Sequence, residues 1–191
     1  MNCTSTDRPS AVLLCAGASS RMGSPKATLP LGSRTVVEAH LDRLRPVCGE
    51  LVVVVGAWES AVRAVLPPDV TVVANPDWAT TSPVDSLRVG LSTAGSSAFV
   101  VPVDTPPAHQ DTLRALLRAG PPATPVDGAG NPGHPVLIGA EIIERVRSGA
   151  VAGGLRTLLV RRSWVVVADP WVAFDFDDPT EWGRFVADWD G

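Results

Sequence analysis

Hydrophobic runs of strand length alternate with segments of helical periodicity along the chain as far as Ala119. The apolar runs are Ala11–Leu14, Leu51–Val55, Thr71–Ala74 and Ala98–Val101, and the helical segments are Thr35–Leu44, Glu59–Val65, Asp85–Ala94 and Gln110–Ala119. Strands and helices that alternate in this way are typical of βαβ units on a mainly parallel sheet. The pattern therefore predicts an α/β fold.

The regular pattern stops after Ala119. The following stretch, GPPATPVDGAGNPGHP, has Pro or Gly every few residues, so we expect a loop or short excursion at the ligand face. Beyond it the expected elements are strands Val136–Ile138 and Ser163–Val167 and helices Glu141–Val146, Leu155–Arg161 and Thr180–Trp189. We expect a single domain over residues 10–191, preceded by a disordered N-terminal extension over residues 1–9.

Composition narrows the choice of partner and compartment. The formal net charge is -4, and the 16 Lys and Arg residues are spread along the chain, which argues against nucleic acid as a partner. The apolar runs are far shorter than the ~20 residues of a membrane-spanning helix. The N-terminus lacks the features of a secretory signal, so we expect a cytoplasmic location, and the three cysteines suggest neither a disulfide framework nor a zinc site. The sequence leaves the oligomeric state open.

The first predicted strand leads into a loop with the composition of a phosphate-binding site. In AVLLCAGASSRMGSPK, Gly17 and Gly23 let backbone N–H groups approach phosphate oxygens, while Arg21 and Lys26 supply positive charge. The spacing fits neither the Walker A loop nor the dinucleotide fingerprint. A glycine-rich turn that only joins a strand to a helix would leave Arg21 and Lys26 unexplained.

This stretch resembles the opening motif of the molybdenum cofactor nucleotidyltransferase family, Leu-Ala-Ala/Gly-Gly-x-Ser-x-Arg-Met-Gly-x-x-Lys, and only Cys15 departs from it. The resemblance implies a Rossmann-like three-layer αβα sandwich of the nucleotide-diphospho-sugar transferase type. It also implies that Arg21 and Lys26 hold the phosphates and act in catalysis. The nucleotide-binding residues that it implies are Leu14, Cys15, Ala16, Gly17, Ala18, Ser19, Arg21, Lys26, Asn75 and Ser86.

Two further motifs come from the middle of the chain. Asp104-Thr105-Pro106 resembles the family's metal motif, and it follows an apolar strand, where a carboxylate could bind Mg²⁺. Such an aspartate often caps the next helix, but here that helix is expected several residues later. ANPDW followed by Ser86-Leu87 resembles the family segment beside the base, although TSPVD replaces the usual Gly-x-Ser-Ser run. Helix N-capping is the alternative role for Asp85 and Ser86.

The last motifs lie in the second half. Gly133-His134-Pro135 resembles an acceptor-side motif of the cytidylyltransferase branch, which makes His134 a candidate acceptor-binding residue; a surface loop histidine is the alternative. FDFDDPTEW resembles the branch's segment at the second metal-ligand position, where Asp177 stands, with Asp175 as the nearest alternative. Both carboxylates could face one ion on an extended segment, or the aspartates could form a capped turn before a helix.

Taken together, the resemblance implies a Mg²⁺-dependent nucleotidyltransferase with Asp104 as a catalytic residue and with Asp104 and Asp177 as metal ligands. Relatives that use CTP carry Leu-Ala-Ala-Gly, so Ala16 favours CTP, with molybdopterin as the phosphorylated acceptor. One alternative is a sibling enzyme that uses GTP or another phosphorylated acceptor. Another is a nucleotide- or flavin-binding protein, or an oxidoreductase, that has lost transfer activity.

Overall fold

The computed structural model describes residues 8–151 and 153–189. Most of the predicted N-terminal extension, residues 1–7, lies outside the described residues. Within that extension Pro9 is buried, and its carbonyl accepts a hydrogen bond from the Gly49 amide at 2.9 Å. The Arg8 guanidinium donates a hydrogen bond to the Arg45 carbonyl at 3.1 Å.

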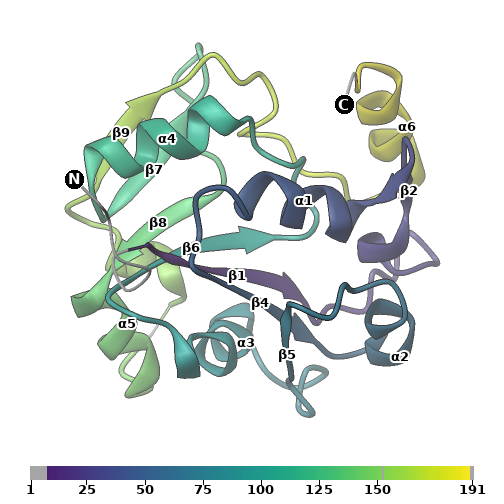
Figure 1. Cartoon of the computed structure of the whole chain (residues 1–191), viewed down its shortest axis with the longest axis horizontal. Helices are drawn as coiled ribbons and strands as arrows, with labels where there is room; N and C mark the ends of the chain where they lie inside the picture. The colour runs from purple at the N-terminus through teal and green to yellow at the C-terminus, as the bar shows by residue number, and fades with distance from the viewer. Residues whose placement is uncertain (1–7, 152, 190–191) are drawn as a thin grey trace.

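The described residues form a seven-stranded sheet with strand order β5-β4-β1-β6-β8-β7-β9 (Figure 1). Its strands are β1 (Ser10–Cys15), β4 (Glu50–Val55), β5 (Thr71–Ala74), β6 (Ser97–Pro102), β7 (Ala123–Val126), β8 (Val136–Gly139) and β9 (Ser163–Val166). Strands β5, β4, β1 and β6 are parallel, β8 is antiparallel to both β6 and β7, and β7 pairs with β9 in parallel. A short hairpin of β2 (Pro30–Leu31) and β3 (Arg34–Thr35) stands apart.

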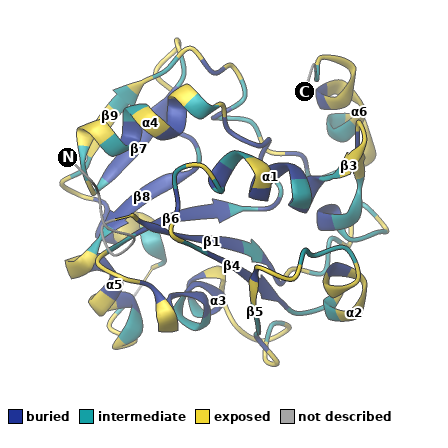
Figure 2. Ribbon diagram, in the orientation of Figure 1, coloured by how far each residue is buried: buried dark blue, intermediate teal, exposed yellow. Residues whose placement is uncertain are grey.

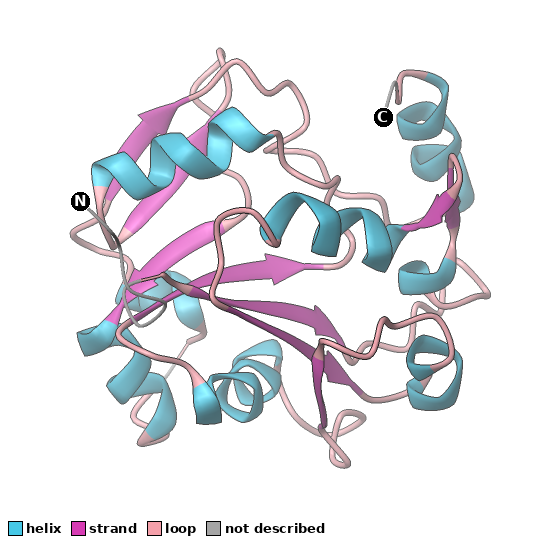
Figure 3. Cartoon of the chain, viewed as in Figure 1, coloured by secondary structure: helices cyan, strands magenta, loops and turns pink. Residues whose placement is uncertain are grey.

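Helices cover both faces of this sheet (Figure 3). They are α1 (Val36–Leu44), α2 (Glu59–Arg63), α3 (Pro83–Gly90), α4 (Gln110–Ala119), α5 (Ala140–Arg147) and α6 (Pro179–Ala187), with 3-10 turns at Lys26–Thr28, Leu91–Thr93 and Leu155–Leu158. In β1, Leu13 packs into the core on the α1 and α4 side, whereas Val12 packs into the core on the α3 and α5 side. Successive side chains of a strand point to opposite faces of the sheet, so a continuous apolar strand contributes side chains to the core on each face. The predicted αβα sandwich is confirmed.

Burial follows the strands. Figure 2 shows the central strands as the dark-blue layer between helices whose outer faces are exposed. Val53, Val54 and Phe99 have no exposed surface, which is the expected state of a parallel sheet covered on both faces. In the described part of the chain, none of the helices combines the length and apolar character needed to cross a membrane.

Two expected elements differ from the structure. The segment predicted as a loop contains β7, whose residues Ala123–Val126 are all buried within the sheet. Proline has no N–H to donate, but β7 and β8 pair at only one position, so Pro125 is tolerated in this strand. Its carbonyl accepts a hydrogen bond from the Gly133 amide at 3.0 Å. The predicted helix Leu155–Arg161 is only the 3-10 turn Leu155–Leu158, which begins after two glycines at positive φ.

Candidate functional site

The loop after β1 is held in shape by its neighbour after β4. A Cβ built on Gly56 would lie 2.5 Å from the Ala16 carbonyl oxygen, so only glycine permits this approach of the two backbones. Two residues on, the Trp58 indole donates to the Ala18 carbonyl at 2.8 Å. Ser19 has a φ of 51°, and its hydroxyl accepts from the Lys26 amide at 3.4 Å. These contacts fix the backbone of the loop that carries Arg21 and Lys26.

Lys26 lies between two carboxylates. Its ammonium nitrogen is 2.6 Å from Oδ1 of Asp177 and 3.5 Å from Oδ2 of Asp104, and its side chain is only 8% exposed. On the outer side, Nη2 of Arg21 is 2.6 Å from Oδ2 of Asp177. The hydrogen bond from Lys26 is the main cause that lowers the pKa of Asp177, with the Arg21 guanidinium adding to it. The two predicted metal-ligand positions therefore converge on one buried cation.

The chain segment before α6 brings Asp177 to this point from far along the sequence. Phe176 is fully buried in the core, and its amide donates to the Asp104 carbonyl at 2.8 Å. Asp178 begins α6 by accepting from the Thr180 and Glu181 amides at 2.8 and 3.0 Å. The proposed capped turn is therefore present at Asp178, while Asp177 points back to the loop after β1.

The β5–α3 connection provides a further wall. Asn75 is buried, and its amide nitrogen donates to the hydroxyls of Ser86 and Thr81, each at 3.0 Å. Asp85 forms a capping box with Ser82, and hydrogen bonds from Ser82 lower its pKa. The segment that replaces the family's Gly-x-Ser-Ser run thus becomes the capped start of α3, two residues earlier than expected.

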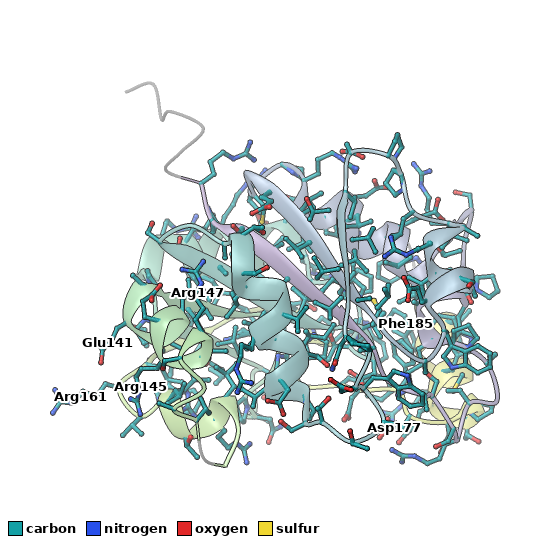
Figure 4. All side chains as sticks on the ribbon, turned by 90° about the horizontal axis from the view of Figure 1, so that it is seen from below. Glu141, Arg145, Arg147, Arg161, Asp177 and Phe185 are labelled. Carbon is teal, nitrogen blue, oxygen red and sulfur yellow. The ribbon has the colours of Figure 1, made fainter. Side chains whose placement is uncertain are left out.

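A cavity of about 530 Å³ opens where these loops meet, at the carboxyl ends of the parallel strands. Of the predicted site residues, its lining includes Leu14, Cys15, Ala16, Gly17, Ser19, Arg21, Lys26, Ser86, Asp104 and Asp177. Ala18 and Asn75 are not in the lining: the Ala18 carbonyl bonds to Trp58, and Asn75 lies behind Ser86. Figure 4 shows Asp177 at the lower right of the molecule, on the side opposite Arg161.

His134 lies apart from this cavity, in a smaller hollow of about 210 Å³ that also has Asp104 and Asp175 in its wall. Burial lowers the pKa of His134, and the charges of Asp104 and Asp175 oppose that shift. Pro102 and Asp104 line both hollows, so the two hollows are adjacent at the end of β6. Asp175 and Asp177 therefore lie in different hollows rather than facing one ion together.

Sequence reasoning missed Trp58, which lines the larger cavity with Trp78. Trp58 follows β4 just as Arg21 follows β1, so its position after a parallel strand was the available signal. Asp175 was considered only as a second choice for Asp177. The sequence spacing did not reveal that Asp175 and Asp177 line different hollows.

The chemistry of the Asp104 and Asp177 carboxylates fits a magnesium ion. Among the described residues no three His, Cys, Asp or Glu side chains gather as a metal cage. Mg²⁺ takes hard oxygen ligands and is commonly bound through one or two carboxylates plus substrate phosphates. Asp104 and Asp177 approach the same ammonium group from two elements, so their donor chemistry fits such an ion.

Fold and pocket together define a Rossmann-like α/β sandwich whose ligand cavity lies at the carboxyl edge of its parallel strands. The sequence profile of the MobA-like NTP transferase domain matches residues 11–165, which is most of the chain. The protein therefore belongs to the MobA-like NTP transferase domain family.

Three relatives illustrate the similarity. The "Probable molybdenum cofactor guanylyltransferase" of Rhodopirellula baltica is 41% identical over 114 residues, 56% of this chain and 54% of that protein. The molybdenum cofactor cytidylyltransferase of Escherichia coli is 24% identical over 177 residues, 89% of this chain and 91% of that one. The Mycobacterium tuberculosis protein Rv0371c, solved in complex with manganese, is 26% identical with a TM-score of 0.75, covering 94% of this chain and 98% of its own. The chain thus spans about half the length of the Rhodopirellula relative in that match.

Proposed function

We propose that this protein is a Mg²⁺-dependent nucleotidyltransferase that transfers a nucleoside monophosphate from an NTP to a phosphorylated acceptor. The observation that carries the proposal is Lys26, a buried cation held between Asp104 and Asp177 beside the glycine-containing loop after β1. Cations and carboxylates at the mouth of one cavity suit triphosphate chemistry, which depends on positioning and charge neutralisation. Membership of the MobA-like family supports the same reaction.

In this reaction an oxygen of the acceptor phosphate forms a bond to the α-phosphorus, and the bond from the α-phosphorus to the bridging oxygen of pyrophosphate breaks. No covalent enzyme intermediate is needed. Lys26 is preorganised by burial, whereas Arg21, whose side chain is 67% exposed, can move from Asp177 to the phosphates. Asp104 and Asp177 would hold the magnesium ion, which supplies charge neutralisation at the phosphates when bound.

We propose CTP as the nucleotide and molybdopterin as the acceptor. Ala16 lines the large cavity, and a glycine in its place would leave more room for a purine. The Escherichia coli relative, named a cytidylyltransferase, supports CTP. The Rhodopirellula relative is named a guanylyltransferase, which makes GTP the specific alternative.

The test is pyrophosphate release from CTP, GTP, ATP and UTP with Mg²⁺, with and without molybdopterin. We expect acceptor-dependent release from CTP alone, and we expect Ala16→Gly to increase the share of turnover with GTP. Release from GTP alone would overturn the nucleotide assignment and leave the reaction class standing. A bound yellow chromophore, with no release from any NTP, would favour a flavin-binding protein.

A further inference from the structure

Strand β9 forms one border of the seven-stranded sheet, with β7 as its neighbour on the inner side (Figure 1). In the described part of the chain five large hydrophobic side chains are exposed, and three of them, Val160, Trp164 and Val166, lie in or just before this strand. Trp164 is 53% exposed and Val166 is 75% exposed. Exposed apolar side chains that gather in this way mark a contact surface.

The backbone of β9 adds hydrogen-bonding groups to this surface. β7 and β9 are parallel, and the amides of Ser163 and Val167 donate to carbonyls on the β7 side at 2.9 and 3.0 Å. Alternate residues of a strand direct their N–H and C=O groups to opposite sides, so those of Trp164 and Val166 point away from β7. The two residues with exposed apolar side chains therefore also present backbone donors and acceptors at the border.

This border lacks the usual protection against strand pairing. Natural edge strands commonly carry charged residues, proline or bulges that keep other strands away. Between Arg162 and Asp169 the chain reads SWVVVA, with neither a charge nor a proline. The opposite border, β5, has no exposed large hydrophobic side chain among its four described residues, and the segment PPDV precedes it. Of the two borders, β9 thus has the composition of a pairing surface.

The two ends of the β9 border carry opposite charges. Helix α4 packs on β7 and β9 and runs against them, because its N-terminus lies at the end of β9, where Asp169 accepts from the His109 amide at 2.8 Å. The start of β9 lies beside the connection that follows α4. The acidic residues at the end of the strands are Asp111, Asp127 and Asp169, and the basic residues at their start are Arg118, Arg161 and Arg162. Figure 4 shows Arg161 projecting from the molecule.

We propose that the β9 border is the contact surface for a second copy of this chain, whose β9 pairs antiparallel to the first about a two-fold axis at Val165. In this register Trp164 faces Val166 of the second copy, and the two residues exchange backbone hydrogen bonds. Their side chains lie on the same face of the joined sheet, so each indole packs on a β-branched side chain. This inference is independent of the proposed transferase function.

The distribution of charge favours a second copy over an unrelated strand. An antiparallel arrangement brings the basic end of each border beside the acidic end of the other, and a surface that complements itself in this way is what a two-fold dimer requires. A stable interface commonly buries about 1,000 Å² or more, which a strand of four residues does not reach alone. Because α4 packs on β9, the pairing also places the α4 helices of both copies on the same face of the joined sheet.

Analytical ultracentrifugation of the full chain, from micromolar to millimolar concentration, tests the dimer. We expect a reversible equilibrium between monomer and dimer. Val166→Lys should raise the dimer dissociation constant by at least about a hundredfold, because the new ammonium group would approach Arg162 of the second copy, which stacks 3.8 Å from the centre of the Trp164 ring. A chain that stays monomeric at every concentration would overturn the proposal and leave the border to a strand of another protein.

The matched control is Val186→Lys, the same change at an exposed valine of α6, which lies far from β9 in Figure 1. It should leave the dissociation constant as in the natural protein. Circular dichroism should show that both variants are folded, since both side chains are exposed. A dimer that survives Val166→Lys, or one that both variants weaken equally, would overturn the assignment of the contact to β9.

An engineered disulfide tests the register. Facing residues of an antiparallel pair that share no hydrogen bond have Cα atoms about 4.5 Å apart, within the range of a disulfide. Val165→Cys lies on the two-fold axis and should cross-link two chains on mild oxidation, in a background with Cys3→Ser, since Cys15 and Cys48 are buried. Val160→Cys, at a position 81% exposed but outside the strand, should not cross-link. Equal cross-linking of both variants, or none at Val165→Cys, would overturn the proposed pairing.

Discussion

The two sides of the sheet hold their charged residues in different ways. At the ends of β1 and β6, Lys26 is already paired with Asp104 and Asp177, and the surrounding loops are held by short hydrogen bonds. Beside β7 and β8, Arg156 and Arg162 form no ion pair with another described residue, and Oγ1 of Thr124 and Nε of Arg162 have no hydrogen-bond partner among those residues. We call the first region the nucleotide side and the second the acceptor side, after the proposed function. The charged groups of the nucleotide side are held by their own ion pairs, whereas no ion pair among the described residues holds the two arginines of the acceptor side.

The largest expected effect is at the residue where the two sides meet. Asp104→Ala should lower turnover by at least about a hundredfold, because it removes a charge-stabilising group at the reaction centre, while the fold is retained. Turnover is measured by pyrophosphate release, and folding by circular dichroism. Asp111→Ala is the control, since the Asp111 side chain is 97% exposed. Activity within a few-fold of the natural protein would contradict the metal-ligand assignment of Asp104.

The preorganisation of the nucleotide side is tested by its two cations. Lys26→Met should lower kcat/KM by about tenfold to a hundredfold, because a buried hydrogen bond to a charged group is lost. Arg21→Met should have a smaller effect, since that ion pair is exposed and screened by solvent. Carbon-13 NMR titration of Asp177 should also show its pKa rising in Lys26→Met. Equal kinetic losses in both variants would contradict the distinction between a fixed and a mobile cation.

The stability of the nucleotide side should depend on pH through His40 of α1, whose Nε2 lies 2.9 Å from the carbonyl oxygen of Thr105. Burial lowers the pKa of His40 to about 4, although this hydrogen bond opposes the shift. The unfolded chain binds the proton more readily, so the contribution is complete above pH 6.5, the usual histidine value, and is lost as pH falls toward 4.

We therefore expect the free energy of unfolding to fall by about 2 kcal/mol more in the natural protein than in His40→Gln between pH 7 and pH 5. Urea unfolding followed by tryptophan fluorescence at the two pH values measures the difference. His134 titrates in both proteins, so its contribution cancels. Parallel pH dependence of the two proteins would show that His40 is not protonated more easily on unfolding.

The same contrast explains how far the sequence predicted the structure. On the nucleotide side the apolar runs, the β1 loop and Asp104 were predictable, because each strand is a continuous apolar segment and its ligand-facing residues follow directly. On the acceptor side β7 was missed, because Pro125 and the flanking glycines are typical of loops and only the tertiary pairing with β8 and β9 makes a strand of them.

The candidate site divides in a similar way. Arg21 and Lys26 could be located from their own loop, but their pairing with Asp177 depends on Phe176, a core residue 150 positions after Lys26. Asn75 was predicted to bind the nucleotide. Its motif located the residue but did not show that its side chain points inward and donates to the Ser86 hydroxyl. Arg162 carried no signal, since a cavity between a 3-10 turn and a strand is a property of the folded chain.

The smallest expected effect concerns Cys15, the one departure from the opening motif. Burial raises the pKa of its thiol, and the charge of Asp104 adds to this, so the reactive thiolate is not formed at neutral pH. Burial likewise raises the pKa of Cys48 to about 12. A buried thiol of this kind behaves as a small apolar group, so Cys15→Ala should keep kcat/KM within about twofold.

The cost in stability should be about 1 kcal/mol, as for the removal of a single small buried group. Iodoacetamide at pH 7 should modify neither Cys15 nor Cys48 in the folded protein, as peptide mass spectrometry would show, and both should react in urea. Rapid labelling of Cys15 in the folded state, or a large loss of activity in Cys15→Ala, would mean that the wall of the nucleotide cavity is chemically active. In that case the preorganised side would depend on more than the pairing of Lys26 with its two carboxylates.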